Sequence, residues 1–287
     1  FRNESTWPKA QPSLNHVIPI SNYRRILKEY TAQDALHNWE RYQCCRLSLE
    51  GLQWIQISDW RTANEVIEVP PPETLIYAAV DFSKSFDITS MAYGYWLNGK
   101  VNVKWHHWVV KDQHVKSVKR DYQRFVDNWD HHENVTICPH TIQYDSVKEK
   151  LESLKSLGNL KRVGYDAFGG MATEIQQWGN IDDSYNPEKD LPMWALPQTI
   201  MSMGPSTYLL ESMLRHKCIA FEKDDIVEYS LANVQLEKNI NGDRRPSKLK
   251  SMGIIDPIVA CVMLCGVLIK EGAERPGAYF DLGDIAC

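Results

Sequence analysis

The sequence predicts an α/β protein with a mixed central β-sheet and helices on both faces. The run from Leu75 to Asp81 is apolar up to its last residue, which is typical of a strand buried on both faces. Two β-rich runs follow, separated by Asn98-Gly99, the strongest short hairpin signal. From Ser146 onwards, helical and strand-like patterns alternate. An antiparallel meander followed by such βα units indicates a mixed sheet.

The individual elements follow from the same patterns. A helix is expected from Ser146, with its apolar residues on one face and Gly158-Asn159 at its end. Another is expected to begin at Pro205, since proline is favoured in the first turn of a helix. The predicted strands cover residues 75–81, 88–97, 101–110, 162–166 and 191–198. The predicted helices cover residues 146–158, 172–178, 205–216, 226–236 and 256–270.

The first 73 residues have a different character. The segment from Trp7 to Pro19 holds three prolines and little periodicity, so we expect an extended linker. A helical pattern runs from Asn22 to Tyr42. The run Pro70-Pro71-Pro72 is the clearest boundary in the chain. The expected organisation is therefore a linker and helical segment over residues 1–73 and the main α/β domain over residues 74–287.

Composition and charge narrow the class of protein. Hydrophobic residues make up 43% of the 287 residues and charged residues 24%, as in ordinary globular proteins. No apolar run is long enough to span a membrane, so no membrane partner is expected. The seven cysteines are odd in number and include no CxxC pair, which favours free thiols over a disulfide scaffold. A net charge of −5 argues against broad electrostatic binding of nucleic acid, but it permits a local basic site.

Three aspartates occupy positions from which they could form one site. Asp81 and Asp166 each end a predicted strand, and Asp256 begins the last apolar helix. If the two strands are parallel neighbours, both carboxylates lie at the carboxyl edge of the sheet, where open α/β sheets place their sites. Crowded carboxylates are costly without a cation, and ligands that offer only oxygen select hard ions such as Mg²⁺ or Mn²⁺.

Each aspartate also has a simpler interpretation. Asp256 precedes Pro257 and could be a helix N-cap. Asp81 and Asp166 could be turn residues that follow a strand. Asp87 could add an auxiliary acidic ligand to the metal site or be a turn residue. The loop 239–250 carries basic side chains that could grip DNA phosphates or could simply be solvated. Its basic residues are Arg244, Arg245, Lys248 and Lys250.

In these motifs the sequence resembles the large subunit of tailed-bacteriophage terminases, in its C-terminal nuclease domain. The resemblance covers the chain from about Trp7 to Gly266 and rests on the order and spacing of short motifs. These are Val80-Asp81-Phe82-Ser83, Gly164-Tyr165-Asp166, Gln198, the segment Ser206 to Leu214, Ala232-Asn233-Val234, and Lys248 to Lys250 leading into Ile254-Ile255-Asp256. The family commonly has glycine after the third aspartate, where this chain has Pro257, so we expect the loop to have a different local shape here.

The resemblance implies an RNase H-like fold and a metal-dependent endonuclease that cuts concatemeric viral DNA during genome packaging. Asp81, Asp166 and Asp256 would hold two Mg²⁺ or Mn²⁺ ions, which activate a water molecule and stabilise the leaving oxygen. The lysine positions of the family favour Lys248 and Lys250 as DNA-binding residues.

The resemblance also implies partners and a location. The expected partners are double-stranded DNA, a packaging ATPase domain in the same full-length protein, the small terminase subunit and the portal protein. The expected location is the host cell cytoplasm, on the procapsid portal. No GxxxxGK[ST] phosphate loop is present, so ATP binding is not expected of these residues.

Two other classes of function remain open. One is another RNase H-like enzyme, such as a transposase, an integrase or a junction resolvase. Many transposases and integrases use glutamate as the third acid, where this chain has Asp256. The other is a docking module of a packaging motor that does not cut DNA. Divalent-metal binding and general cleavage of DNA would separate the nuclease from both.

Overall fold

The chain forms two compact units, Phe1–Gln56 and Ile57–Cys287, in the computed structural model. The structure describes residues 4–32, 39, 43, 54–83, 88–111, 129, 131–166, 172–182, 185–251 and 253–272. No helix among these residues has both the length and the apolar character that crossing a membrane would require.

The first unit is built around an aromatic cluster. A short 3-10 helix, η1 (Glu4–Thr6), leads into α1 (Trp7–Ala10), and α2 (Ile20–Ala32) follows after a series of turns. Trp7, Tyr23 and Trp39 are buried and pack edge to face, with ring centroids 4.5 to 5.6 Å apart. The prediction of an extended linker over residues 7–19 is therefore wrong. Burial of Trp7 folds this segment back onto α2, which outweighs the preference of its prolines for extended backbone.

The second unit contains one mixed seven-stranded sheet and a two-stranded hairpin. The strand order along the large sheet is β4-β3-β2-β1-β5-β6, and β7 pairs with β3. Its strands are β1 (Leu75–Asp81), β2 (Thr89–Leu97), β3 (Lys100–Val110), β4 (Val135–Cys138), β5 (Asn159–Tyr165), β6 (Met193–Ala195) and β7 (Ile219–Phe221). The hairpin pairs β8 (Leu236–Lys238) with β9 (Arg244–Pro246).

Strand β1 lies at the centre of the sheet and links its two halves. It pairs antiparallel with β2, as the sequence predicts, and parallel with β5, which meets the condition under which Asp81 and Asp166 reach one edge. Asn98 and Gly99 join β2 to β3 with positive φ angles of 52° and 76°, the backbone that a tight hairpin turn requires. In the parallel pair, Val80 is in register with Tyr165. The carboxyl ends of β1 and β5 therefore meet at one edge.

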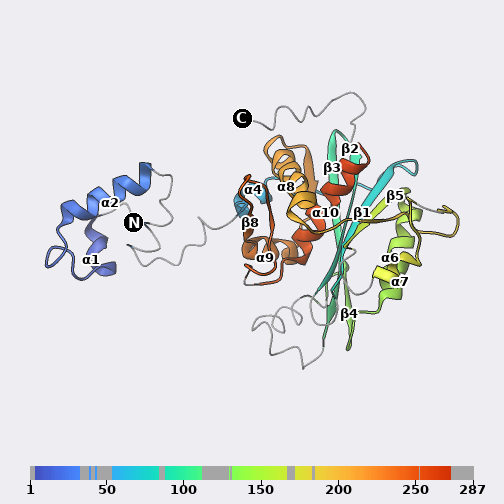
Figure 1. Ribbon diagram of the computed structural model, residues 1–287, viewed down its shortest axis with the longest axis horizontal. Coiled ribbons are helices and arrows are strands. Elements are labelled where there is room, and N and C mark those ends of the chain that lie inside the picture. Colours follow the sequence, from blue (N-terminus) through green and yellow to red (C-terminus); the bar gives the residue numbers. More distant parts are fainter. Residues whose placement is uncertain are drawn as a thin grey trace. The chain divides into compact units, whose positions relative to one another are not determined.

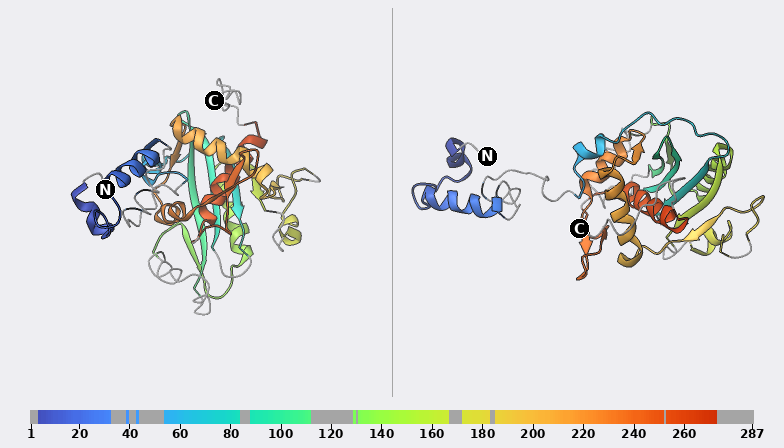
Figure 2. Two further views of the ribbon diagram at one scale, coloured as in Figure 1. Left: turned by 60° about the vertical axis from the view of Figure 1, so that its left-hand side comes forward. Right: turned by 90° about the horizontal axis from the view of Figure 1, so that it is seen from above.

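Helices cover both faces of the sheet, which confirms the predicted layers (Figure 1). The right-hand view of Figure 2 shows the same separation from above, with the green helix on one side of the strands and the orange and red helices on the other. One face carries α6 (Tyr144–Leu157) and α7 (Ala172–Gln176). The other carries α8 (Ile200–Arg215), α9 (Asp225–Asn233) and α10 (Asp256–Lys270).

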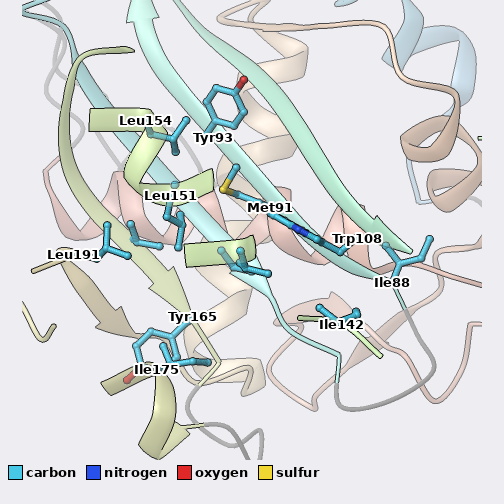
Figure 3. Close-up of a cluster of buried hydrophobic side chains, with 14 of the residues drawn as sticks. Ile88, Met91, Tyr93, Trp108, Ile142, Leu151, Leu154, Tyr165, Ile175 and Leu191 are labelled. Atoms are coloured by element: carbon cyan, nitrogen blue, oxygen red, sulfur yellow. The ribbon is translucent and has the colours of Figure 1, made fainter. Parts of the chain in front are cut away.

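The core between the sheet and α6 is large and apolar. Leu151 and Leu154 of α6 meet Met91 and Trp108 from β2 and β3 (Figure 3). All four are buried. The helical spacing of the leucines and the alternation of the strands direct these side chains into one layer. This layer stabilises the sheet from the side opposite to the candidate site.

Helix α10 packs directly across β1, β2 and β5 on the other face. The helix is apolar on every side and is buried from Asp256 to Leu268. Gly164 of β5 allows the close approach, because a Cβ there would lie 2.7 Å from Val267 and 3.6 Å from Ala79. Ala79 and Gly164 therefore face α10. Since side chains alternate along a strand, Asp81 and the position of Asp166 lie on that same face.

Several boundaries differ from the sequence prediction. Helix α8 begins at Ile200, with Thr199 as its N-cap, so Pro205 lies inside the helix and does not start it. Strands β4, β7, β8 and β9 were not predicted from the sequence, and of these β9 lies within the predicted basic loop. These strands are short, and short strands give too few alternating positions to be recognised.

The segment from Ile57 to Pro72 belongs to the second unit and packs on its sheet. Helix α4 (Ile57–Arg61) carries Trp60, whose ring stacks on Phe221 with centroids 3.9 Å apart. Glu65 N–H donates to the Phe221 carbonyl at 2.9 Å, and Phe221 N–H donates to the Ala63 carbonyl at 2.8 Å. The domain boundary expected between residues 73 and 74 stays a prediction, and these contacts define a test of it.

Four cysteines lie in the described part of the chain, and all are free and buried. They are Cys138, Cys218, Cys261 and Cys265. The prediction of free thiols is confirmed for these four. Cys44, Cys45 and Cys287 lie outside the described residues.

A network of hydrogen bonds joins Ser90, His107 and Asn134 to Asp224, the N-cap residue of α9. His107 Nδ1 lies 3.0 Å from Ser90 Oγ, and His107 Nε2 lies 3.0 Å from Asp224 Oδ2. Asn134 donates to the same Asp224 oxygen at 2.6 Å. The other oxygen of Asp224 caps α9 by accepting the N–H of Val227 at 3.1 Å. Burial alone would raise the pKa of Asp224, but His107, the backbone N–H and Asn134 together lower it to about 2.

This network predicts a specific loss of stability in acid. A carboxyl whose pKa is lowered in the folded state stabilises that state above its ordinary pKa of 3.8, and the contribution disappears as the pH falls towards 2. We expect Asp224 to contribute about 2 kcal/mol at pH 5 that is lost by pH 2. Asp224→Asn should remove this pH dependence, as measured by urea unfolding between pH 5 and pH 2. The control is Asp225→Asn, an exposed neighbour. An unchanged pH profile in Asp224→Asn would contradict the assignment.

Candidate active site

The first predicted site residue, Asp81, ends the central strand. It is 1% exposed and lies on the face covered by α10. Its register partner on β2 is Ser90, a member of the network of hydrogen bonds that includes Asp224. An ionised carboxylate in such a place needs compensating charge or hydrogen bonds. Its alternative interpretation, a turn residue after the strand, is wrong because Asp81 is itself the last residue of β1.

Asp256 approaches the same place from α10. It is the first residue of the helix and is 1% exposed. The N-cap position belongs to Ile255, and no side chain caps the helix there. The alternative interpretation of Asp256 as an N-cap is therefore wrong. Its carboxylate is directed to another partner, the ammonium group of Lys248.

Lys248 joins the two aspartates. Its Nζ donates to Asp256 Oδ1 at 2.8 Å and lies 2.8 Å from Asp81 Oδ2. The side chain is 42% exposed, so its stem faces solvent while its ammonium reaches the buried carboxylates. Burial would lower the pKa of Lys248, but the two carboxylates outweigh it and raise that pKa above its ordinary value.

The other oxygen of Asp81 is held by Gln198. Gln198 Nε2 donates to Asp81 Oδ1 at 2.8 Å and also lies 3.4 Å from the sulfur of Met263. Asp81 Oδ2 is buried and faces the Lys248 ammonium at 2.8 Å. The amide therefore fixes the orientation of the carboxylate, and the other carboxylate oxygen is paired with an ammonium group.

The electrostatics of this cluster are unbalanced. Burial raises the pKa of Asp81 to about 7, and the charge of Asp256 adds to the rise. Lys248 and Gln198 act in the opposite direction without cancelling it. One ammonium thus faces two buried carboxylates. Such a site favours an additional positive charge, which is the condition for binding a divalent cation.

Asp166, the third predicted carboxylate, lies at the adjacent strand end. It directly follows Tyr165, the register partner of Val80, and it is half-buried. The backbone therefore brings Asp166 to the same edge and the same face as Asp81. Within the described residues, however, no group of three His, Cys, Asp or Glu side chains is placed to hold a metal ion. The structure joins Asp81 to Asp256, and the three-aspartate metal site stays a prediction.

The other predicted site residues have diverse surroundings. Asp87 lies outside the described residues. Arg244 pairs with Glu211 and lies over the ring of Tyr208, at 4.8 Å from its centroid. Arg245 pairs with Glu237 at 2.6 Å. These arginines therefore have carboxylate partners within the chain.

Lys250 is exposed, and no ion pair involving it occurs among the described residues. It is thus the predicted DNA-binding residue that is most available to a phosphate. The assignment of these four basic residues to DNA binding stays a prediction.

Sequence reasoning assigned no role to Gln198. Its signal was its position between a short strand, β6, and the N-cap Thr199 of α8. Strand β6 runs parallel to β5, so a residue that follows it reaches the same edge of the sheet as Asp81. Lys248 was predicted to bind DNA. Its contact with two carboxylates that lie eight or more residues away in the chain could not be inferred from the spacing of residues in the sequence.

The mixed sheet, the two helical layers and the aspartates at the carboxyl edge define a protein of the RNase H-like class. The chain matches the family model "Terminase large subunit, endonuclease domain" over residues 1–271, and it belongs to that family. The crystal structure of the HK97 bacteriophage large terminase matches with a TM-score of 0.62 and 20% sequence identity. That match covers 92% of this chain and 54% of the HK97 chain, so the chain spans about half the length of that terminase.

Two further structures are more distant. The large terminase nuclease from thermophilic phage G20c matches with a TM-score of 0.46 and 12% identity, covering 69% of this chain and 85% of that chain. The same nuclease with bound magnesium matches with a TM-score of 0.44 and 11% identity, covering 70% and 85%. These low scores add nothing to the fold assignment. No curated protein matches the chain.

Proposed function

We propose that this chain is a divalent-metal-dependent DNA endonuclease that cuts concatemeric viral DNA during genome packaging. The observation that carries the proposal is the buried Asp81–Asp256 pair at the carboxyl edge of the sheet, in a member of the terminase endonuclease family. Neither aspartate supports the fold as a cap or a turn residue. Two buried carboxylates without such a role are costly, and a function that needs them explains their presence.

The residues present fit a hard divalent cation. Asp81 Oδ2 is buried and already faces one cationic group, the Lys248 ammonium, and the two aspartates offer only oxygen as ligand atoms. Asp81 and Asp256, with Asp166 from the adjacent strand, would hold one or two Mg²⁺ or Mn²⁺ ions. When bound, such ions lower the pKa of a water molecule and stabilise the leaving oxygen of a phosphodiester.

The chain's own residues have distinct tasks in this proposal. Gln198 orients Asp81 through Oδ1, so that Oδ2 is presented to the cation. Helix α10 fixes Asp256 in its rigid first turn. Lys250, exposed near the site, neutralises a DNA phosphate. Since no predicted element is a helix suited to reading the major groove, cleavage should be nearly independent of sequence.

The partners of the cleavage reaction follow from the family. We propose that double-stranded DNA is the substrate and that a packaging ATPase domain belongs to the same full-length protein. The small terminase subunit and the portal protein would supply position and timing. Cleavage would then take place in the host cell cytoplasm, on the procapsid portal.

A plasmid assay tests the proposal. The purified chain is incubated with supercoiled plasmid and Mn²⁺, Mg²⁺ or EDTA. We expect nicking and linearisation with a divalent metal, and none with EDTA. Cleavage that resists EDTA would overturn the metal-dependent mechanism. Cleavage restricted to branched DNA would favour a junction resolvase.

A chain that neither cuts nor is stabilised by Mn²⁺ in thermal unfolding would favour the docking module. A metal site raises the stability of the folded state by mass action even when the protein cannot cut. The thermal measurement therefore separates a silent nuclease from a chain without a metal site.

A further inference from the structure

We propose that Lys248 is an exchangeable internal counter-ion of the active site. Its ammonium holds Asp81 and Asp256 together in the metal-free chain and withdraws to solvent when a divalent cation is loaded. Lys248 thus weakens metal binding and stabilises the empty site. This inference rests on the proposed function, because it concerns the same two carboxylates.

The geometry makes the ammonium and the cation competitors. Lys248 Nζ lies 2.8 Å from one oxygen of each aspartate. A divalent cation held by Asp81 and Asp256 would need the same carboxylate oxygens. Two positive charges that share the same two oxygens would be only a few ångströms apart and would repel strongly in a buried place. The Lys248 ammonium and the metal ion therefore cannot both bind closely to Asp81 and Asp256.

The turn that carries Lys248 is anchored on both sides. Ser247 N–H donates to the Gln235 carbonyl at 2.9 Å, and Gln235 N–H donates to Ser251 Oγ at 3.0 Å. Ser251 N–H closes the turn onto the Ser247 carbonyl at 3.0 Å. The backbone of the turn is therefore held in place, so an exchange of partners falls to the lysine side chain.

The side chain has a route out of the site. Lys248 is 42% exposed, whereas Asp81 and Asp256 have side chains only 2% exposed. Rotation about the bonds of the exposed stem moves the ammonium into water without opening the core. The withdrawn ammonium stays at the mouth of the site, where it can meet a DNA phosphate.

The charge of the site explains why the ammonium binds in the metal-free state and leaves in the metal-bound state. Without Lys248, the metal-free site would hold two buried like charges, which is costly. When both carboxylates are ionised, the ammonium offsets one of their two negative charges. A divalent cation neutralises the pair completely, and the ammonium is then no longer needed there.

The first test measures metal affinity by isothermal titration with Mn²⁺. We expect Lys248→Met, which keeps the length of the stem, to bind Mn²⁺ about tenfold more tightly than the wild type, within the usual range of coupling between competing ligands. The matched control is Lys250→Met, an exposed lysine of the same turn, whose affinity should not change. Unchanged or weaker binding by Lys248→Met would overturn the proposal.

The second test uses the wild-type chain and needs no folded variant. An amine-acylating reagent is applied with and without Mn²⁺, and modification is measured by peptide mass spectrometry. Lys248 should react more slowly than Lys250 without metal, because its amine is ion-paired to two carboxylates. Mn²⁺ should bring its rate close to that of Lys250. A rate that does not respond to Mn²⁺ would show that the ammonium does not leave.

The two tests separate this proposal from the proposed function. A wild type that cuts DNA with Mn²⁺, while Lys248→Met binds the ion no more tightly, keeps the nuclease and rejects the exchange. If the wild type and Lys248→Met both fail to bind Mn²⁺, both proposals fall. If Lys248→Met binds Mn²⁺ and the wild type does not, the proposal is supported in its strongest form, in which Lys248 completely blocks metal binding.

Discussion

Asp81→Asn and Asp256→Asn should each lower the rate of metal-dependent plasmid cleavage by at least about 100-fold. Removal of a residue that only supports a metal ligand typically lowers metal affinity or activity by about 10-fold to 100-fold. Removal of a direct ligand should therefore cost at least about 100-fold. Asparagine keeps the shape of each side chain and removes its charge. The folded state should survive, because removal of one of two crowded carboxylates relieves repulsion.

A graded series makes this prediction sharper. Gln198→Met should lower the rate by about 10-fold to 100-fold, since it removes only the hydrogen bond that orients Asp81. Asp166→Asn should behave like the other two aspartate variants if Asp166 is a ligand. Asp59→Asn, at an exposed position of α4, is the matched control and should cut at the wild-type rate. Full activity in Asp81→Asn would place the chemistry elsewhere.

Trp60→Ala should destabilise the second unit by about 3–5 kcal/mol, the usual cost of removing a buried tryptophan. Trp60 is 1% exposed and stacks on Phe221, and its centroid lies 6.2 Å from that of Trp105. The substitution leaves a cavity between α4 and the sheet. Urea unfolding of the full chain, followed by circular dichroism, measures the loss.

The control for this prediction lies in the same segment. Val66 is 95% exposed, and Val66→Ala should change the free energy of unfolding by less than about 0.5 kcal/mol. A loss below about 1 kcal/mol in Trp60→Ala would mean that residues 57–73 do not belong to the folding unit of the sheet. The domain boundary predicted at residues 73 and 74 would then be correct.

The central strands were predictable because their signals are local. The run that ends at Asp81 is apolar because β1 lies in the middle of the sheet, with α10 and α6 on its two faces. Asn98-Gly99 determines its hairpin through backbone angles that few other residues adopt. Helix α10 was equally clear, since its length and apolar character are properties of its own residues.

The errors arise where distant contacts outweigh local preference. Pro205 predicted the start of α8, but the cap formed by Thr199 starts the helix earlier. Strand β7 is only three residues long, and it exists because Val101 to Val103 of β3 offer it a partner. The prolines after Trp7 predicted extended backbone, but the aromatic cluster buries that tryptophan.

The sequence by itself determined the fold class, the central strands and the positions of three aspartates at element ends, because these depend on periodicity and on local turn chemistry. Only the tertiary structure decided how the carboxylates are neutralised. Asp81, Lys248 and Asp256 come together because α10 crosses β1 and the turn before it is pinned to the β8–β9 hairpin. A contact between residues so far apart in the chain depends on packing, and no local pattern encodes it.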